Sequence, residues 1–268
     1  MPRSMWTGSL SFGLVNVPVA LFSGVNDTDV HFRQLHDKDH TPVETRRFCK
    51  QEDAEVGYEE IAHGFETDDG KQVVLTDEEL ATAAPRKTRT IDIEAFVDLV
   101  DVDPIYFDHP YILMPAGDTE GTQRAYRLLR EVMERTDRAA LGRFVMRTKE
   151  YLVLIGVRDD RLALTTLRFA DEVRPAKGIP TPGKKAKPAK QAVDGAVALI
   201  EALACDWDPG NYRDEYEKRL KRVIKRKEKG QTVKTPERQD EPSPVPDLMA
   251  ALEQTLAEIK DGKRPVPA

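Results

Sequence analysis

The basic side chains of this chain are the residues whose type and spacing point most directly to a chemistry, the binding of phosphate groups. Lysine and arginine on an exposed segment can neutralise DNA phosphates without reading any base. No helix-turn-helix, zinc finger or other base-reading element is evident, so such binding would follow backbone and shape. Charge alone favours the plainer alternative for each run, a solvated surface. The candidates near the N-terminus are Arg33, Lys38, Arg46, Arg47 and Lys50, followed by Arg86, Lys87 and Arg89.

A third basic run lies at 218–229, where eight basic residues accompany one acidic residue. On a helix these cations would form a face opposite an apolar stripe that includes Tyr216, Leu220 and Val223. A solvated face is as good an interpretation as contact with DNA or with an acidic partner.

Side chains suited to catalysis or metal binding do not form a recognisable set. The chain has no phosphate-binding loop, nucleophile elbow or zinc-protease motif. His31, His36 and His40 have helical spacing, but the turn residues between and after them argue against a helix, so they would not converge on one ion. Cys49 and Cys205 stand alone, and we expect two free thiols. We therefore expect no catalytic residue, no metal site and no cofactor.

Charge is distributed unevenly along the 268 residues, whose formal net charge is -6. Residues 1–176 carry 22 basic and 32 acidic side chains, residues 177–235 carry 15 and 8, and residues 236–268 carry 4 and 7. The middle segment is thus a basic island in an acidic protein, and overall charge does not exclude a nucleic-acid partner. No apolar run approaches the ~20 residues that cross a bilayer, and no signal core follows the start, so we expect a cytoplasmic protein without membrane contact.

The elements that must position these residues are mainly strands. Residues 6–22 read as a strand pair or as one long bent strand, and residues 90–114 and 142–169 alternate in the way of further strands. One substantial helix is expected over 119–136. Many short strands with so few helices favour a mainly β, α+β fold with a closed or nearly closed β-barrel over residues 1–175.

The segment at about 30–70 has too few apolar residues for two buried faces, so we expect it to project from the barrel as an arm. A short strand at 72–75 follows. Thr76 and Glu79 then form a capping box that opens a short helix ending near Pro85.

The C-terminal third is expected to be helical. A Lys- and Pro-rich linker spans 176–190, and a helical module spans 191–232, with one helix at 193–203, a turn and helix start at 208–211, and an apolar stripe that begins at Tyr212. Gly230 should end the second helix. A Pro-rich linker at 233–246 then leads to an amphipathic helix at 247–260.

Many ordered blocks of the sequence resemble the bacterial Ku family. The similarity covers roughly residues 1–232, and it rests on many blocks in order, not on one short motif. The blocks include Trp-Thr-Gly-Ser-Leu-Ser-Phe-Gly-Leu-Val-Asn-Val-Pro-Val at 6–19, Phe-Arg-Gln-Leu-His at 32–36, Val-Leu-Thr-Asp-Glu-Glu-Leu at 74–80, Asp-Pro-Ile-Tyr-Phe at 103–107, Leu-Arg-Phe-Ala-Asp-Glu-Val at 167–173 and Trp-Asp-Pro at 207–209.

The resemblance implies a β-barrel with a long arm, two copies of which close a homodimeric ring around double-stranded DNA. Linear DNA can thread through a ring and closed circles cannot, which would give end specificity without a catalytic site. Such a ring needs a basic inner arm on a body that may be acidic. The family resemblance does not assign individual DNA contacts; the eight N-terminal cations are chosen by charge and position.

The resemblance also implies a partner, the ATP-dependent DNA ligase D of non-homologous end joining, recruited by the C-terminal module. The residues assigned to that contact are Trp207, Tyr212, Tyr216, Arg219, Arg222, Lys225 and Arg226. Some relatives carry a long Lys-rich tail, where this chain has an acidic Pro-rich linker and one helix. The alternative function is a barrel-type interaction scaffold that does not encircle DNA, for which the cations of the arm would have no use.

Overall fold

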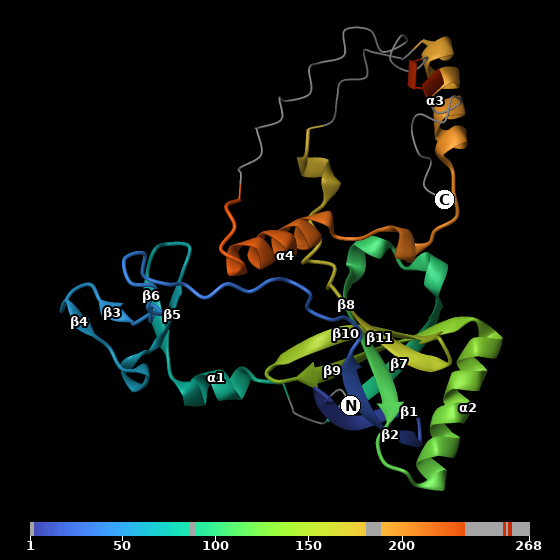
Figure 1. Cartoon of the computed structure of the whole chain (residues 1–268). Coiled ribbons are helices and arrows are strands. Elements are labelled where there is room, and N and C mark those ends of the chain that lie inside the picture. The colour runs from blue at the N-terminus through green and yellow to red at the C-terminus, as the bar shows by residue number, and fades with distance from the viewer. Residues whose placement is uncertain (1–2, 86–88, 181–188, 234–253, 256, 259–268) are drawn as a thin grey trace. The chain divides into compact units, whose positions relative to one another are not determined.

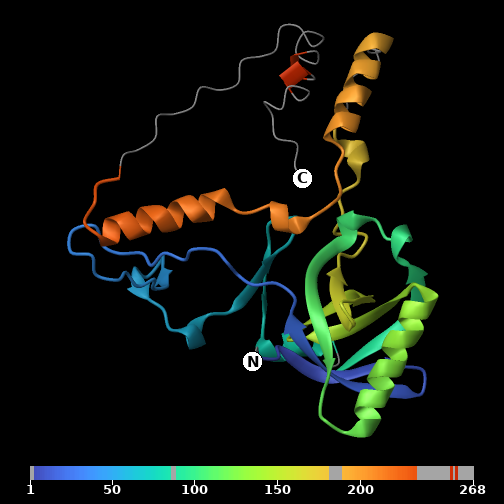
Figure 2. The same cartoon turned by 45° about the vertical axis from the view of Figure 1, so that its right-hand side comes forward.

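The computed structural model describes residues 3–85, 89–180, 189–233, 254, 255, 257 and 258. The chain divides into two units (Figures 1 and 2). The first comprises Met1–Thr28 and Phe32–Ala176, and the second comprises Asp29–His31 and Lys177–Ala268. None of the described helices is long and apolar enough to cross a membrane.

A closed seven-stranded barrel forms the centre of the first unit, which confirms the predicted fold class. Its strands follow the order β1 (Trp6–Phe12), β2 (Val15–Ser23), β8 (Phe107–Pro115), β11 (Arg161–Leu167), β10 (Lys149–Arg158), β9 (Arg138–Met146) and β7 (Thr90–Asp98). All neighbours are antiparallel except β1 and β7, whose parallel pairing closes the barrel.

Alternating apolar residues fill the barrel core. Leu10, Val19, Leu21, Leu113 and Ile155 are at most 1% exposed. Two boundaries differ from the expectation from sequence. Strand β9 begins at residue 138, and residues 105 and 106, expected as strand after a turn at Asp-Pro, form part of a 3-10 turn (Pro104–Tyr106). The Asp103 carboxylate caps this turn by accepting from the Ile105 N–H at 3.0 Å, and Pro104 fits its first position, which accounts for the late start of β8.

Helix α2 (Glu120–Thr136) packs on the barrel core through Tyr126 and Met133, as the sequence predicted for 119–136. The Thr119 hydroxyl caps it by accepting from the N–H of Thr122. It ends at Asp137, whose φ of 50° is left-handed. The helix thereby covers apolar strand residues that would otherwise face water.

The Tyr126 hydroxyl links this helix to two barrel strands. It donates to the Leu113 carbonyl at 2.7 Å and accepts from the Leu162 N–H at 2.9 Å. Burial raises the pKa of this hydroxyl, so it stays protonated and can donate at neutral pH.

Replacing Tyr126 by Phe should destabilise the first unit by about 1–3 kcal/mol, because the buried Leu162 N–H and Leu113 carbonyl would both be left without this partner. Urea denaturation followed by circular dichroism measures the change in the free energy of unfolding. Tyr58→Phe, at a side chain that is 75% exposed, is the control and should leave stability unchanged. Equal stability of the two variants would contradict the bridging role.

The arm, defined here as residues 32–85, contains three small antiparallel pairings instead of one hairpin. These are a bridge between Leu35 and Pro42, strands β3 (Phe48–Cys49) with β4 (Ala54–Glu55), and strands β5 (His63–Glu66) with β6 (Gln72–Leu75). Helix α1 (Asp77–Ala83) follows, opened by the capping box of Thr76 and Glu79 that the sequence predicted.

The second unit contains α3 (Lys190–Leu203), a 3-10 turn (Pro209–Asn211) and α4 (Glu215–Glu228). The prediction that the second helix begins at 208–211 was wrong, because α4 begins after Asp214, whose carboxylate accepts from the N–H groups of residues 216 and 217. Tyr212 therefore lies outside the helix. Gly230, with φ of 70°, follows the helix end as expected.

Parts of the predicted C-terminal organisation lie outside the described residues. These are 181–188 of the first linker, 234–246 of the second, and most of the expected helix at 247–260. Within that last segment, the described residues 254, 255, 257 and 258 have helical backbone.

Candidate nucleic-acid interface

The arm leaves its large apolar side chains exposed to solvent. No residue from 32 to 85 is buried, and ten large apolar side chains there are 38% to 75% exposed. They are Phe32, Leu35, Val43, Phe48, Tyr58, Ile61, Phe65, Val73, Val74 and Leu80. So much exposed apolar surface on one segment indicates a partner surface, since monomers seldom leave such patches uncovered.

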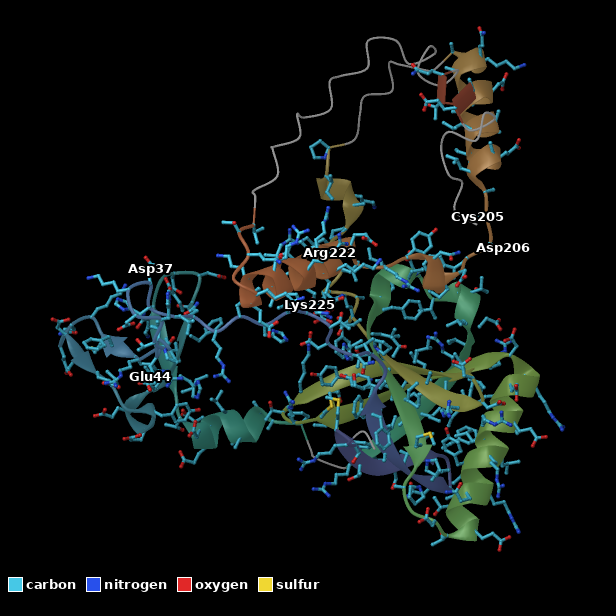
Figure 3. The ribbon with its side chains drawn as sticks, viewed as in Figure 1. Asp37, Glu44, Cys205, Asp206, Arg222 and Lys225 are labelled. Carbon is cyan, nitrogen blue, oxygen red and sulfur yellow. The ribbon has the colours of Figure 1, made fainter. Side chains whose placement is uncertain are left out.

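Lys38 lies in the turn between Leu35 and Pro42. The Asp39 carboxylate organises this turn by accepting from the N–H of Thr41 at 3.1 Å and from its hydroxyl at 2.8 Å, and it contacts His36 Nδ1 at 3.0 Å. These hydrogen bonds, that from the Thr41 N–H first, lower the pKa of Asp39. The exposed Lys38 side chain thus lies in an ordered turn, next in sequence to Asp37, which Figure 3 labels.

Arg46 is engaged inside the arm. Its guanidinium lies 3.0 Å from the carboxylate of Glu55 on β4 and 3.4 Å from that of Glu44. Two acids therefore already offset its charge, and its first role is to hold the β3–β4 hairpin. This residue is the weakest of the DNA-contact candidates proposed from the sequence.

Arg47 and Lys50 are better placed to meet a phosphate. The Arg47 guanidinium lies over the Tyr58 ring, 5.4 Å from its centroid, and the Arg47 carbonyl accepts from the N–H of Val56. Lys50 is exposed at the turn that joins β3 to β4. Within the described chain, Arg33, Lys38, Arg47 and Lys50 have no acidic partner.

The arm was expected to be basic, but its net charge is negative. Residues 32–85 hold six Lys and Arg against fourteen Asp and Glu. Several of these acids are committed to local contacts, as Glu79 is in its capping box and Asp77 is beside His63 at 3.7 Å. Positive charge on the arm is therefore confined to its few cations without an acidic partner, and the arm as a whole is acidic.

The second basic group is described only in part. Arg86 and Lys87 lie outside the described residues. Arg89 is exposed, has a left-handed φ of 49°, and accepts from the Ser9 N–H at 2.9 Å through its carbonyl. That hydrogen bond holds the Arg89 backbone against β1 of the barrel.

No catalytic set emerges among the described residues, where no group of three or more His, Cys, Asp and Glu side chains could hold a metal. The two cysteines are free thiols, as expected. Hydrogen bonds from the N–H groups of residues 52 and 51 lower the pKa of Cys49. Among the described residues, no histidine is among the groups that shift the pKa of this thiol, as the histidine of a catalytic pair would be.

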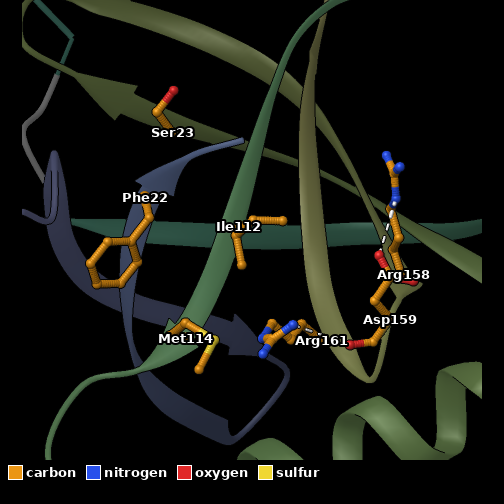
Figure 4. Close-up of a pocket in the computed structure, with 7 residues that line it drawn as sticks. All are labelled: Phe22, Ser23, Ile112, Met114, Arg158, Asp159 and Arg161. Carbon is orange, nitrogen blue, oxygen red and sulfur yellow. Dashed lines mark hydrogen bonds and ion pairs between the residues drawn. The ribbon is translucent and has the colours of Figure 1, made fainter. Parts of the chain in front are cut away.

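An apolar hollow of about 430 Å³ lies on the barrel between β2, β8 and the β10–β11 turn (Figure 4). Phe22, Ile112 and Met114 supply its apolar wall, and arginines flank it beside Asp159. Its Ser23 hydroxyl donates to the Val25 carbonyl at 2.7 Å, so it is not prepared as a nucleophile.

The second unit exposes aromatic and basic side chains together. Trp207 and Tyr212 stack with centroids 5.2 Å apart and 24° between the rings, and they are 76% and 55% exposed. Tyr216, at the start of α4, is 65% exposed. Along α4, Lys218 and Lys221 pair with Glu215 and Glu217, respectively. In the described part of this helix, no close ion pair engages Arg219, Arg222, Lys225 or Arg226, of which Figure 3 labels Arg222 and Lys225. Lys218 chiefly lowers the pKa of Glu215, and the charges of Arg222 and Arg219 add to this effect.

These features define an α+β protein in which a closed barrel carries a long exposed arm with unpaired cations. The family model described as the Ku70/Ku80 beta-barrel domain matches residues 11–195, more than half of the chain, and the chain therefore belongs to the Ku family.

Curated relatives agree over nearly the whole length. The chain is 39% identical over 263 residues to non-homologous end joining protein Ku 1 of Geotalea uraniireducens, covering 97% of this chain and 99% of that protein. It is 39% identical to the protein of the same family from Heliobacterium modesticaldum, covering 96% and 92%. The Bacillus subtilis relative is 33% identical, covering 99% and 85%. A solved SPOC domain of human PHD-finger protein 3 aligns with 62% of this chain and 95% of its own, at 11% identity, but its TM-score of 0.30 is too low to bear on the fold.

Proposed function

We propose that this chain binds the ends of linear double-stranded DNA without sequence specificity, as a homodimeric ring, in the repair of double-strand breaks by non-homologous end joining. It acts in the cytoplasm, at the nucleoid, and has no catalytic role of its own. Membership of the Ku family, with relatives named for end joining, is the observation that carries this proposal.

The arm supports the homodimer. Its ten exposed apolar side chains need a covering surface, and a second copy of the chain supplies one by symmetry. The DNA contacts fall on its unpaired cations, Arg33, Lys38, Arg47 and Lys50, with Arg89 at the barrel and Arg86 and Lys87 beside it in sequence. Because these contacts are to phosphates, the logarithm of the DNA-association constant should fall linearly with the logarithm of the salt concentration, with a slope of about 0.9 per phosphate neutralised.

The second unit is assigned to recruitment of the ATP-dependent DNA ligase D. Its stacked aromatic pair and the unpaired cations of α4 offer both hydrophobic anchors and charge to a partner. An acidic patch on the ligase with a pocket for an aromatic side chain is the surface that would complement it.

Linear duplex should be bound and covalently closed circular duplex of the same sequence should not, because only an end can be threaded. A mobility-shift titration with both forms, with sedimentation velocity to establish the dimer, measures this. Equal binding to both forms would contradict the ring and favour the scaffold alternative. Incubation of labelled duplex with the protein and magnesium or manganese checks for cleavage, which would contradict a non-enzymatic role.

A further inference from the structure

Two arginines occupy backbone positions that arginine rarely takes. Among the described residues, seven residues other than glycine have positive φ. Five of them are His40, Asp53, Asp137, Asp159 and Asp160, of the residue types enriched in this left-handed region. The other two are Arg89 and Arg147, with φ of 49° and 61°.

Arg147 is the first residue of a two-residue hairpin loop, since Met146 pairs with Lys149 across it. Glycine is the preferred residue at the first loop position when only that residue has positive φ. The loop between β10 and β11 shows the usual solution, because Asp159 and Asp160 fill its two positive-φ positions. The β9–β10 loop retains an arginine although glycine would fit its backbone better, which points to a use for the side chain.

Both arginines border Trp6. A Cβ atom placed on Gly8 would lie 2.2 Å from the Arg89 carbonyl oxygen and 2.2 Å from Cη2 of Trp6, so the Arg89 backbone and the indole lie close together. On another side, Trp6 lines a hollow of about 330 Å³ with Arg3, Ser4, Met5, Met146 and Arg147. The Trp6 ring is held by an edge-to-face contact with Phe144 at 5.5 Å.

Two arginines and no acidic residue line the hollow. Arg3 and Arg147 have no carboxylate partner within the described residues, and neither has Arg89. The neighbouring cations of the hairpin are matched, Arg143 with Glu94 at 3.2 Å and Lys149 with Glu172 at 3.5 Å. Acidic residues thus neutralise the cations beside the loop, whereas Arg3 and Arg147 have no carboxylate partner within the described residues.

We propose that Arg3 and Arg147 form a phosphate-binding site beside Trp6 at this edge of the barrel, close to the backbone of Arg89. Arginine binds phosphate through two parallel N–H donors, and a pair of unopposed guanidinium groups beside a rigid aromatic wall suits one phosphate group. The inference rests on the proposed function for its ligand, DNA phosphate, and it supplies positive charge that the net acidic arm lacks. The phosphate comes either from the duplex backbone or from the 5′ end.

Arg147→Gly is the most informative variant, because it removes the guanidinium group and also the backbone strain of a positive φ at a residue other than glycine. We expect an unchanged or raised melting temperature together with about tenfold weaker binding to linear duplex and a salt slope shallower by about one unit. Asp159→Gly, a positive-φ position in the other hairpin, and Arg127→Gln, an exposed arginine on α2, are the controls for backbone and charge. Both controls should bind as the unaltered protein does.

Two further comparisons distinguish the two sources of phosphate, and they also distinguish failure of the phosphate site from failure of the proposed function. Weakening confined to 5′-phosphorylated duplex assigns the site to the end phosphate, and equal weakening with 5′-hydroxyl duplex assigns it to the backbone. Undiminished binding by Arg147→Gly overturns the site. If the unaltered protein binds no linear duplex, the proposed function fails, and a melting-temperature assay with inorganic tripolyphosphate tests the phosphate site separately. A rise in melting temperature that Arg147→Gly abolishes supports the site. No rise in either protein overturns the site.

Discussion

Replacing Arg47 and Lys50 together by Glu should weaken binding to linear duplex by about a hundredfold or more. Both cations lack an acidic partner in the described chain, so each is free to meet a phosphate, and its reversal turns attraction into repulsion. The salt dependence of log K should become shallower by about two units, one for each phosphate that is no longer neutralised. Fluorescence anisotropy with a short labelled duplex at several salt concentrations measures both quantities.

The matched control makes the same change of charge on α2, with Arg124 and Arg127 both replaced by Glu. These residues are exposed on the barrel's covering helix, outside the arm. Sedimentation velocity should show that both double variants remain dimers, because neither removes an exposed apolar side chain of the arm. Similar weakening in the two variants would mean that net charge, and not the arm, governs binding.

Arg46 distinguishes the two roles that an arm cation can have. Its ion pairs with Glu44 and Glu55 connect residues of the same hairpin, so its reversal would disturb local structure as well as charge. Weaker binding by Arg46→Glu would therefore be ambiguous. Its neighbour Arg47 contacts an aromatic ring and no acid, which makes Arg47 the more informative residue to reverse.

Replacing Trp207 and Tyr212 together by Ala should remove the stimulation of ligase D while leaving end binding intact. The two rings form one exposed stack, and buried aromatic anchors commonly supply about 2 kcal/mol or more each to an interface. We expect binding to the ligase to weaken by at least about thirtyfold. A pull-down with purified ligase and a nick-ligation assay on linear substrates measure binding and stimulation.

Leu128→Ala on α2 serves as the control for this variant, since it removes an apolar side chain that is 61% exposed in the first unit. Deleting residues 190–268 should reproduce the effect of the double aromatic variant. Normal ligase stimulation by the truncated protein would place the ligase-binding surface in the first unit and contradict the assignment of the second.

The barrel and its helix could be predicted from the sequence because the patterns that indicate them are local and repeated. Alternation of apolar residues predicted strands that the structure contains, and the capping box at Thr76 and Glu79 fixes the start of α1 without any tertiary contact. The boundaries that differ have equally local causes. Pro104 delays β8, and Asp214 starts α4 three residues after the 3-10 turn, leaving Tyr212 outside the helix.

The candidate interface could be predicted as a set of residues but not as an electrostatic surface. The sequence located the cations of the arm, yet nothing in their spacing distinguishes Arg46, which two acids engage, from Arg47, which none does. Its fourteen acidic residues were equally visible, but the pairing of Glu55 with Arg46 depends on a contact in space that their spacing does not reveal. Arg3 and Arg147 were missed because they are far apart in the sequence, and only the fold brings them to one hollow.

By itself, the sequence determined the class of fold, the presence of an arm with too few apolar residues to bury, and a separate basic helical module, because each follows from composition and periodicity along the chain. Only the tertiary structure decided which charges are free and which are paired. It also brought Arg3 and Arg147, which are far apart in the chain, beside one indole, because barrel closure joins β1 to β7 and β7 to β9. Charge pairing and convergence depend on distances in space, which sequence spacing does not contain.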